Sequence, residues 1–522
     1  MDDDILDVAI VGGGVSGLWC GWRLTDPGAG TGRRGRVELF EGSDRLGGRL
    51  LSVELPGLAG VACELGGMRY MSSQALVRWL VEDVLDLEPI PAPVAQPSNL
   101  AYLRGRRLRL SHLTDPAAVP YQLSGDEMGR GPDVLLQDAV AEIVPAVRHL
   151  TGPALRKAVE EATYDGQPVW SQGFWNLLAR TMSHEAYRFA EEAGGYDTVM
   201  LNWNAADTIL LNFDFGPDVT FHRIAEGFEA VPHRLARRFE DQGGRIHART
   251  WVRSVDVALL DDGSTGVVLE VEGAETGPAT VRARAAVLAM PRRSIELLRP
   301  TGVLADEALR RLLPTVTPIP LFKAFLAYDR PWWEAAGVEA GRSVTDLPLR
   351  QVYYWHAGGP EESAVLLATY DDTLNVTFWQ GLAGEGGLAD LALDHLPGPR
   401  ARALAEDPGR GWRPYRTSGA LVAEAHRQLG AVHGMPEAPP PYAAVYHDWS
   451  ADPFGGGVNF WNRGVRSWEV IPRMAHPVPS CPVYVCGEAY SGTQGWVEGA
   501  LETAELVLTR HLGLAPAPAP GR

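Results

Sequence analysis

The sequence has few cysteines, no long hydrophobic run and no excess of positive charge. Its four cysteines, Cys20, Cys63, Cys481 and Cys486, are too few for the disulfide framework of a small secreted scaffold. No uninterrupted apolar run reaches about 18 residues, so we expect no membrane span and no membrane partner. Acidic residues outnumber basic ones by 65 to 47, and the net charge of −18 argues against nucleic acid as a partner. A soluble enzyme with a small ligand fits these limits.

The start and the length of the chain set two further expectations. Asp2, Asp3 and Asp4 stand where a secretory signal peptide would carry positive charge, so we expect a cytoplasmic protein. At 522 residues the chain is too long for one compact core and should divide into roughly two or three domains.

A glycine-rich turn follows the first apolar run, Val8–Val11. It contains Gly12, Gly14 and Gly17, with Ser16 between the last two. In this pattern the first glycine turns the chain, the second lets a pyrophosphate approach the backbone, and the third lets helix and strand pack closely. The helix expected next would offer free N–H groups and a positive dipole end to phosphates.

A second apolar run, Val37–Phe40, ends at Glu41. A carboxylate at this point can accept both hydroxyls of a ribose, whereas it would repel a 2′-phosphate. The polar loop from Asp26 to Arg36 accounts for the long spacing between the glycines and this acid. The order of strand, glycines, helix, strand and acid therefore predicts a dinucleotide site. The alternative is a glycine-rich turn in an ordinary α/β domain.

Two more segments place an arginine after paired glycines. Arg49 follows Gly48 and supplies a planar fork suited to a pyrophosphate oxygen, although a turn with a solvated arginine would look the same. Arg69 follows Gly67 and Met68 in an apolar setting, where a buried guanidinium needs an anionic partner. That partner is either a ligand or a structural acid such as Glu64.

These segments, in this order, resemble the flavin-containing amine oxidase family. The stretch Glu64–Tyr70 is similar to L-amino acid oxidases and amino acid 2-monooxygenases. The resemblance implies an α/β fold with a discontinuous, Rossmann-like FAD-binding domain, a mixed-sheet substrate domain and a helical subdomain. We predict the FAD-binding domain at residues 1–72, 221–300 and 470–513, the substrate-binding domain at 73–132 and 301–469, the helical subdomain at 133–220, and a disordered tail at 514–522.

The resemblance also implies roles in catalysis. Arg69 and Tyr370 would bind a substrate carboxylate, and Lys323, in the apolar strand Leu321–Leu326, would hold a water near the flavin. The alternatives are a core tyrosine and a lysine that reaches the surface. Trp496 would line the substrate site.

The family's closing flavin motif resembles the strand Val483–Cys486 and the segment that follows it. There a helix N-terminus would lie against the flavin, and the backbone of Val252 would pair with the adenine. No cysteine stands between Cys63 and Cys481, so we expect non-covalent FAD. The residues expected to contact the cofactor are Gly12, Gly14, Ser16, Gly17, Glu41, Gly48, Arg49, Gly67, Met68, Arg69, Val252, Gly487, Glu488, Gly495, Trp496, Val497 and Ala500.

The implied reaction is oxidation of a free L-amino acid by hydride transfer to flavin N5 and then to O₂, giving a 2-oxo acid, ammonia and hydrogen peroxide. Three alternatives stay open: a 2-monooxygenase that forms an amide, an oxidase of a carboxylate-free amine, and a binding protein of the same fold such as the Rab GDP-dissociation inhibitors. We expect a homodimer and no metal site. Sixteen tryptophans hint only slightly at a bulky side-chain pocket.

Overall fold

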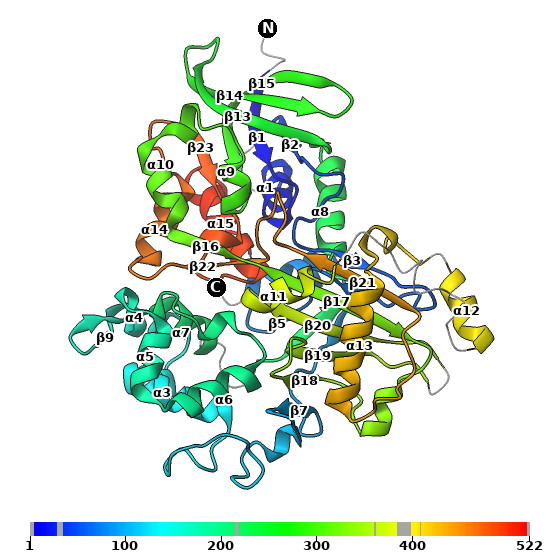
Figure 1. The fold of residues 1–522 in the computed structure, drawn as a ribbon. Coiled ribbons are helices and arrows are strands. Elements are labelled where there is room, and N and C mark those ends of the chain that lie inside the picture. Colours follow the sequence, from blue (N-terminus) through cyan, green and yellow to red (C-terminus); the bar gives the residue numbers. More distant parts are fainter. Residues whose placement is uncertain are drawn as a thin grey trace.

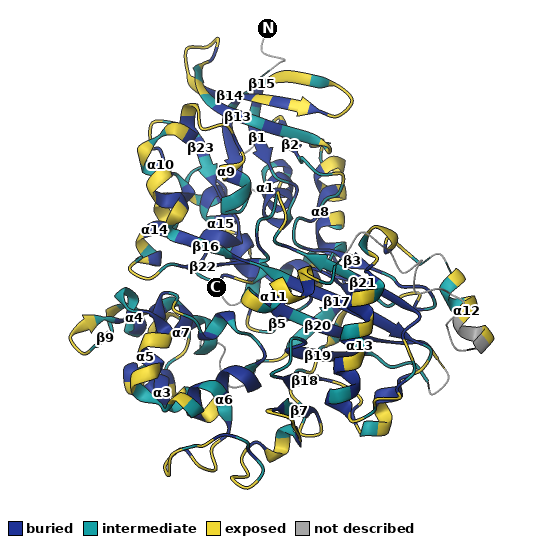
Figure 2. Cartoon of the chain, viewed as in Figure 1, coloured by how far each residue is buried: buried dark blue, intermediate teal, exposed yellow. Residues whose placement is uncertain are grey.

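Two seven-stranded sheets organise the protein, one at the top and one at the lower right of Figure 1. The computed structural model describes residues 5–28, 35–213, 219–359, 362–383, 398–407 and 409–518. A helical region fills the lower left of the same view. Strands of both sheets are mostly buried, and exposed residues lie on the outer faces of the helices, in loops and on the hairpin at the top of the view (Figure 2).

The first sheet has a parallel centre. Strand β1 (Ile5–Val11) lies between β2 (Val37–Phe40) and β15 (Gly277–Leu288) and pairs in parallel with both. Val8 and Ile10 belong to one core cluster and Ala9 and Val11 to another, so both faces of the sheet are covered. The remaining strands are β12 (Arg245–His247), β13 (Thr250–Leu259), β14 (Thr265–Gly273) and β23 (Val483–Val485).

Helices α1 (Val15–Thr25), α8 (Ala230–Asp241) and α15 (Val497–Arg510) share one of these cores, which contains Leu18, Leu235 and Leu501. The opposite core takes residues from α10 (Glu307–Leu312) and α14 (Ser467–Ala475). The α/β fold with a Rossmann-like sheet is therefore confirmed.

The second sheet is mixed, as predicted, because β18 pairs in parallel with β7 while its other strand pairs are antiparallel. Helix α13 (Gly419–His433) crosses it in Figure 1, and its residues Leu429 and Val432 join the core of this sheet. The strands, in sheet order, are β21 (Ala443–Asp448), β17 (Leu321–Tyr328), β20 (Ala364–Asp372), β19 (Gln351–His356), β18 (Arg342–Thr345), β7 (Leu100–Leu103) and β8 (Arg106–Arg109).

The helical region has its own core, which includes Phe174, Leu177 and Tyr187. Its helices are α3 (Pro132–Ile143), α4 (Gly152–Glu161), α5 (Phe174–Thr181), α6 (His184–Gly194) and α7 (Ala205–Phe213), with a small hairpin of β9 (Thr163–Tyr164) and β10 (Gln167–Pro168). No helix in the described ranges combines the length and apolar character that crossing a bilayer requires.

Shorter elements join these parts. Strands β16 (Val316–Ile319) and β22 (Val458–Trp461) pair across the middle of Figure 1. Strand β11 (Phe221–Ile224) pairs with β5 (Tyr70–Met71) on one side and β6 (Pro89–Pro91) on the other. Residues that follow the helical region in the chain thereby lie beside the segment that carries Arg69.

The predicted domain boundary at residue 73 needs a correction. Helix α2 (Ala75–Arg78) and the π-helix η1 (Trp79–Val84) pack into the core beneath the first sheet, where Leu76 and Leu80 are fully buried. The carboxylate of Glu498 on α15 accepts hydrogen bonds from the backbone N–H groups of Leu76 and Val77, at 3.0 and 2.8 Å. This segment therefore belongs with the first sheet. Helix α10 was also predicted to belong to the substrate domain, but it packs into the opposite core of the first sheet.

The predicted disordered tail is wrong for residues 514–518. Leu514 and Ala517 are buried against the first-sheet core. The guanidinium of Arg23 donates to the carbonyl of Ala515 at 2.6 Å, and Ala517 N donates to Glu505 Oε2 at 2.9 Å. Arg23 on α1 and Glu505 on α15 hold this alanine- and proline-rich segment. Residues 519–522 lie outside the described residues.

Candidate active site

A cavity of about 770 Å³ opens at the carboxyl ends of the parallel strands. Val11 at the end of β1, Phe40 at the end of β2 and Ala289 just after β15 all line it. The helical region and the second sheet supply the other walls, for example through Leu136 and Tyr370. A crevice outside the carboxyl ends of the strands is where open α/β sheets bind ligands.

The three glycines of the first turn have different surroundings. A Cβ at Gly12 would lie 2.5 Å from Ala289 O, and one at Gly17 would lie 2.0 Å from Gly12 O, so both positions are closed by backbone. A Cβ at Gly14 would meet only Gly48 Cα, at 3.9 Å, and Gly14 lines the cavity. Helix α1 starts after Gly14 with no side-chain cap, so its first N–H groups are available to an anion.

Glu41 lines the cavity. Its carboxylate accepts hydrogen bonds from Gly13 N at 2.6 Å and from Ser43 N at 2.8 Å. These bonds fix the carboxylate beside the glycine turn. Trp251 and Val252 line the cavity with it. A fixed acceptor beside apolar side chains suits a ribose and its base.

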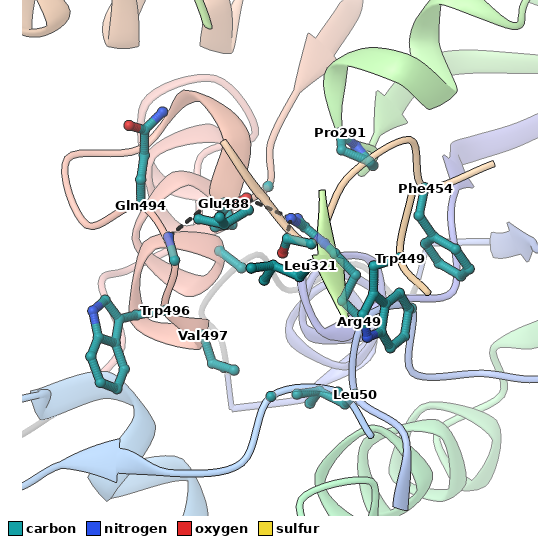
Figure 3. Close-up of a pocket in the computed structure, with 18 of the residues that line it drawn as sticks. Arg49, Leu50, Pro291, Leu321, Trp449, Phe454, Glu488, Gln494, Trp496 and Val497 are labelled. Atoms are coloured by element: carbon teal, nitrogen blue, oxygen red, sulfur yellow. Dashed lines mark hydrogen bonds and ion pairs between the residues drawn. The ribbon is translucent and has the colours of Figure 1, made fainter. Parts of the chain in front are cut away.

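Arg49 and Glu488 join the two predicted cofactor segments. Arg49 Nη1 donates to Glu488 Oε2 at 2.8 Å and to Gly457 O at 3.0 Å. The other oxygen of Glu488 accepts from Gly495 N at 2.7 Å, which holds the turn before α15 (Figure 3). Both side chains line the cavity, so the pair fixes a guanidinium at its wall.

Arg69 lies among aromatic rings. Its Cζ is 4.6 Å from the ring centroid of Phe221 and 5.7 Å from that of Tyr353. The Phe221 ring stacks on Trp496 with centroids 6.3 Å apart. No carboxylate in the described part of the chain forms an ion pair with Arg69. Its cation–π contacts supply no opposite full charge, so the guanidinium can pair with an anionic ligand in the cavity.

Glu64, the acid proposed as a structural partner for Arg69, is engaged elsewhere. Its carboxylate accepts hydrogen bonds from Ser52 Oγ and Phe228 N, both at 2.7 Å. Burial raises the pKa of Glu64 to about 7. A structural Glu64–Arg69 salt bridge is therefore not formed.

Lys323 is one of two lysines in the chain and is only 2% exposed. Its Nζ donates to the carbonyls of Gly66 and Glu64 and lies 4.3 Å from the ring centroid of Tyr370. Burial lowers the pKa of Lys323 to about 7; Glu64 opposes this shift and Arg69 adds to it. The alternative of a lysine that reaches the surface is excluded.

The cavity brings together nearly all of the predicted site residues. They are Gly12, Gly14, Ser16, Glu41, Gly48, Arg49, Gly67, Met68, Arg69, Val252, Lys323, Tyr370, Gly487, Glu488, Gly495, Trp496, Val497 and Ala500. Gly17 is not among the lining residues, because its contact is with Gly12 behind the turn. No described cysteine lines the cavity.

Sequence reasoning missed Tyr196, Phe221 and Arg342, all of which line the cavity. The Tyr196 ring meets that of Tyr370 edge to face at 5.3 Å. Phe221 starts β11, and Arg342 starts β18. None of the three stands in a spaced motif, so only the fold reveals them.

The donor set fits FAD. An open glycine turn and a free helix N-terminus suit a pyrophosphate, and Glu41 suits a ribose without a 2′-phosphate. Gly12, Gly14, Ser16, Glu41 and Arg49 would hold the nucleotide, while the turn before α15 would hold the flavin end.

Known proteins are similar to this chain in sequence and in fold. The family described as flavin containing amine oxidoreductase matches residues 15–507. Aplysianin-A of Aplysia kurodai is 26% identical over 97% of this chain and 90% of its own length. An L-amino-acid oxidase of Mus musculus is 24% identical over 95% of this chain and 69% of its own.

Among solved structures, the fold is shared with cyclohexylamine oxidase from Brevibacterium oxydans IH-35A. The TM-score is 0.63 at 19% identity, covering 96% of this chain and 97% of the other. Sequence, fold and cavity agree, and the chain belongs to the flavin-containing amine oxidoreductase family.

Proposed function

We propose that the protein oxidises a free L-amino acid with non-covalently bound FAD and O₂, giving a 2-oxo acid, ammonia and hydrogen peroxide. The observation that carries the proposal is Arg69, which lines the cavity without an ion-pair partner in the described chain. A substrate carboxylate supplies the anion that this guanidinium lacks. When bound, FAD would supply the redox chemistry by accepting a hydride from the substrate Cα, and O₂ would accept the two electrons to become hydrogen peroxide.

The side chains of the cavity orient the substrate. Arg69 and Tyr370 hold its carboxylate. Phe221 and Trp496 form an apolar wall that keeps water away from the reacting carbon. Lys323 uses two Nζ hydrogens on main-chain carbonyls, so its protonated form has one hydrogen left to hold a water. The substrate amine reacts in its neutral form, and no side chain is assigned as its base.

The test is a peroxide-coupled screen of the purified flavoprotein against amino acids and the corresponding decarboxylated amines. We expect peroxide with at least one amino acid, none with its amine, and a 2-oxo acid by mass spectrometry. An amide product would instead identify a 2-monooxygenase. Activity confined to amines, or a purified protein without flavin, would refute the proposal.

Arg69→Ala gives the matched mutational test. Removing one partner of a buried charge pair costs about 2–5 kcal/mol, so kcat/KM for the amino acid should fall roughly 30-fold to several thousand-fold. Arg282→Ala, at the exposed hairpin end of the first sheet, is the control and should leave kcat/KM unchanged. A homodimer and a cytoplasmic location stay predictions.

A further inference from the structure

We propose that the substrate is an acidic L-amino acid and that Arg342 binds its side-chain carboxylate. This inference rests on the proposed oxidation of a free L-amino acid and adds the class of its side chain. It starts from a second guanidinium in the same cavity, at the first residue of β18.

The guanidinium of Arg342 uses only one of its three nitrogens in hydrogen bonds within the described chain. Its Nη1 donates to Gly194 O at 3.1 Å and to Gln351 Oε1 at 2.9 Å. Within the described chain, Nε and Nη2 make no hydrogen bond and no carboxylate forms an ion pair with the side chain. A guanidinium stays protonated at any working pH, so one that lines a cavity favours an anion beside it.

The backbone leaves room for this arrangement. Gly195 has φ +85°, and a Cβ there would lie 2.7 Å from Gln351 Cγ and 3.2 Å from Arg342 Nη1. Because a side chain at this position would displace both groups, glycine at 195 preserves the contact between Gln351 and Arg342.

One tyrosine connects the two cationic groups. Tyr353 OH donates to Gln351 Oε1 at 3.2 Å, the same oxygen that accepts from Arg342. The Tyr353 ring centroid is 5.7 Å from Arg69 Cζ. The two guanidinium groups are thus separated by little more than one side chain. A short dicarboxylic amino acid can place its α-carboxylate at Arg69 and its second carboxylate at Arg342.

Within the described chain, the acids that line the cavity form no ion pair with Arg69 or Arg342. Asp372 lines the cavity, but its two carboxylate oxygens accept hydrogen bonds from the backbone N–H groups of Asp197 and Thr198, at 3.1 to 3.2 Å. Asp133, at the start of α3, is exposed at the rim. Lys323 adds a third basic group to Arg69 and Arg342. Cationic groups in a low-dielectric cleft favour anionic substrates.

The first experiment compares isosteric substrates of the wild-type holoenzyme. We expect kcat/KM for L-glutamate or L-aspartate to exceed that for L-glutamine or L-asparagine by at least about 30-fold, because only the acids engage the second guanidinium. A preference for neutral, aromatic or basic amino acids would overturn the inference and leave the proposed function standing. Peroxide with no amino acid at all would overturn both.

The second experiment uses Arg342→Gln, with Arg107→Gln as the control. Arg107 lies on β8 of the same sheet and does not line the cavity. We expect Arg342→Gln to bring the ratio of kcat/KM between the acid and its amide close to one, while Arg107→Gln leaves that ratio unchanged. Equal loss on both substrates in Arg342→Gln would show a merely structural role and overturn the inference.

A third measurement needs neither turnover nor a variant. Glutarate and butyrate are titrated into the wild-type holoenzyme, and binding is followed by the change in flavin absorbance. We expect glutarate to bind at least about tenfold more tightly, since it alone carries a second carboxylate. Equal affinities would overturn the inference.

Discussion

Arg49 and Glu488 are 439 residues apart in sequence and form an ion pair of 2.8 Å at the cavity wall. We predict that Arg49→Ala weakens FAD binding, because the variant loses a guanidinium suited to the pyrophosphate and releases the carboxylate that holds Gly495. Hydrogen bonds to charged groups contribute about 1.5–3 kcal/mol, so the Kd should rise roughly 10- to 100-fold. Titration of deflavinated protein with FAD measures it. The control Arg282→Ala should bind FAD as the wild type does, and an unchanged Kd in Arg49→Ala would separate Arg49 from the cofactor.

Two alanine substitutions in one turn should have different effects, one on folding and the other on FAD binding. Gly17→Ala places a Cβ 2.0 Å from Gly12 O, so we predict loss of folded protein. Gly14→Ala meets nothing closer than Gly48 Cα at 3.9 Å, so the protein should fold with a near-native Tm. Its new methyl group takes space from the pyrophosphate, and FAD content after purification should fall. Full FAD content in Gly14→Ala would exclude close approach of the phosphates to this glycine.

Lys323 should make stability depend on pH above neutrality. Burial lowers its pKa from 10.5 to about 7, so between these values the unfolded chain binds a proton that the folded protein has released. Stability then rises with pH across that window, by up to about 1.4 kcal/mol per pH unit. Lys323→Met should remove this rise, as measured by urea unfolding between pH 7 and 10.

Glu64 provides the control for Lys323, because its effect on the unfolding free energy has the opposite sign and occurs in a lower pH range. Burial raises its pKa from 4.5 to about 7, so the folded protein holds a proton that the unfolded chain has lost. Stability from this group falls as pH rises from 4.5 to 7. In Glu64→Gln, the unfolding free energy should no longer fall between pH 4.5 and 7, while its rise above pH 7 should remain. If the unfolding free energy of Lys323→Met still rose above pH 7, Lys323 would not be the cause of that rise.

The cofactor half of the site was predictable because its residues are fixed by local geometry. Gly12 and Gly17 face backbone oxygens, and Glu41 must end the second strand; each requirement leaves a spaced motif. In the substrate half, Arg69, Lys323, Tyr370 and Trp496 were predicted through the family resemblance, whereas Tyr196, Phe221 and Arg342 stand in no such motif. Phe221 and Arg342 reach the cavity only through strand pairing that brings β11 and β18 to it.

The domain boundary at residue 73 failed for a related reason. The apolar spacing from Ser73 to Leu87 predicts a helix, but the same apolar stripe could cover either sheet. The hydrogen bonds that the Glu498 carboxylate accepts from the backbone of Leu76 and Val77 decide the matter, and they join residues more than 400 positions apart. The sequence of the C-terminal tail is likewise of low complexity, which predicts disorder. Its order depends on hydrogen bonds to Arg23 and Glu505, which the tail's own sequence does not reveal.

Glu505 should contribute more to stability than any exposed acid in an ion pair. It is 2% exposed and accepts hydrogen bonds from Trp19 Nε1 at 2.8 Å, Arg23 Nη1 at 3.1 Å and Ala517 N at 2.9 Å. Glu505→Ala leaves the buried Arg23 without its counter-charge and should cost about 3–5 kcal/mol of unfolding free energy. Glu307→Ala, in a pair with Arg311 whose side chains are 78% and 75% exposed, should cost about 0–0.5 kcal/mol. Denaturant unfolding of both variants measures the difference. If both variants lost the same unfolding free energy, the Glu505–Arg23 pair would be as weak as a solvent-screened surface pair. Glu505 would then not anchor the C-terminal segment.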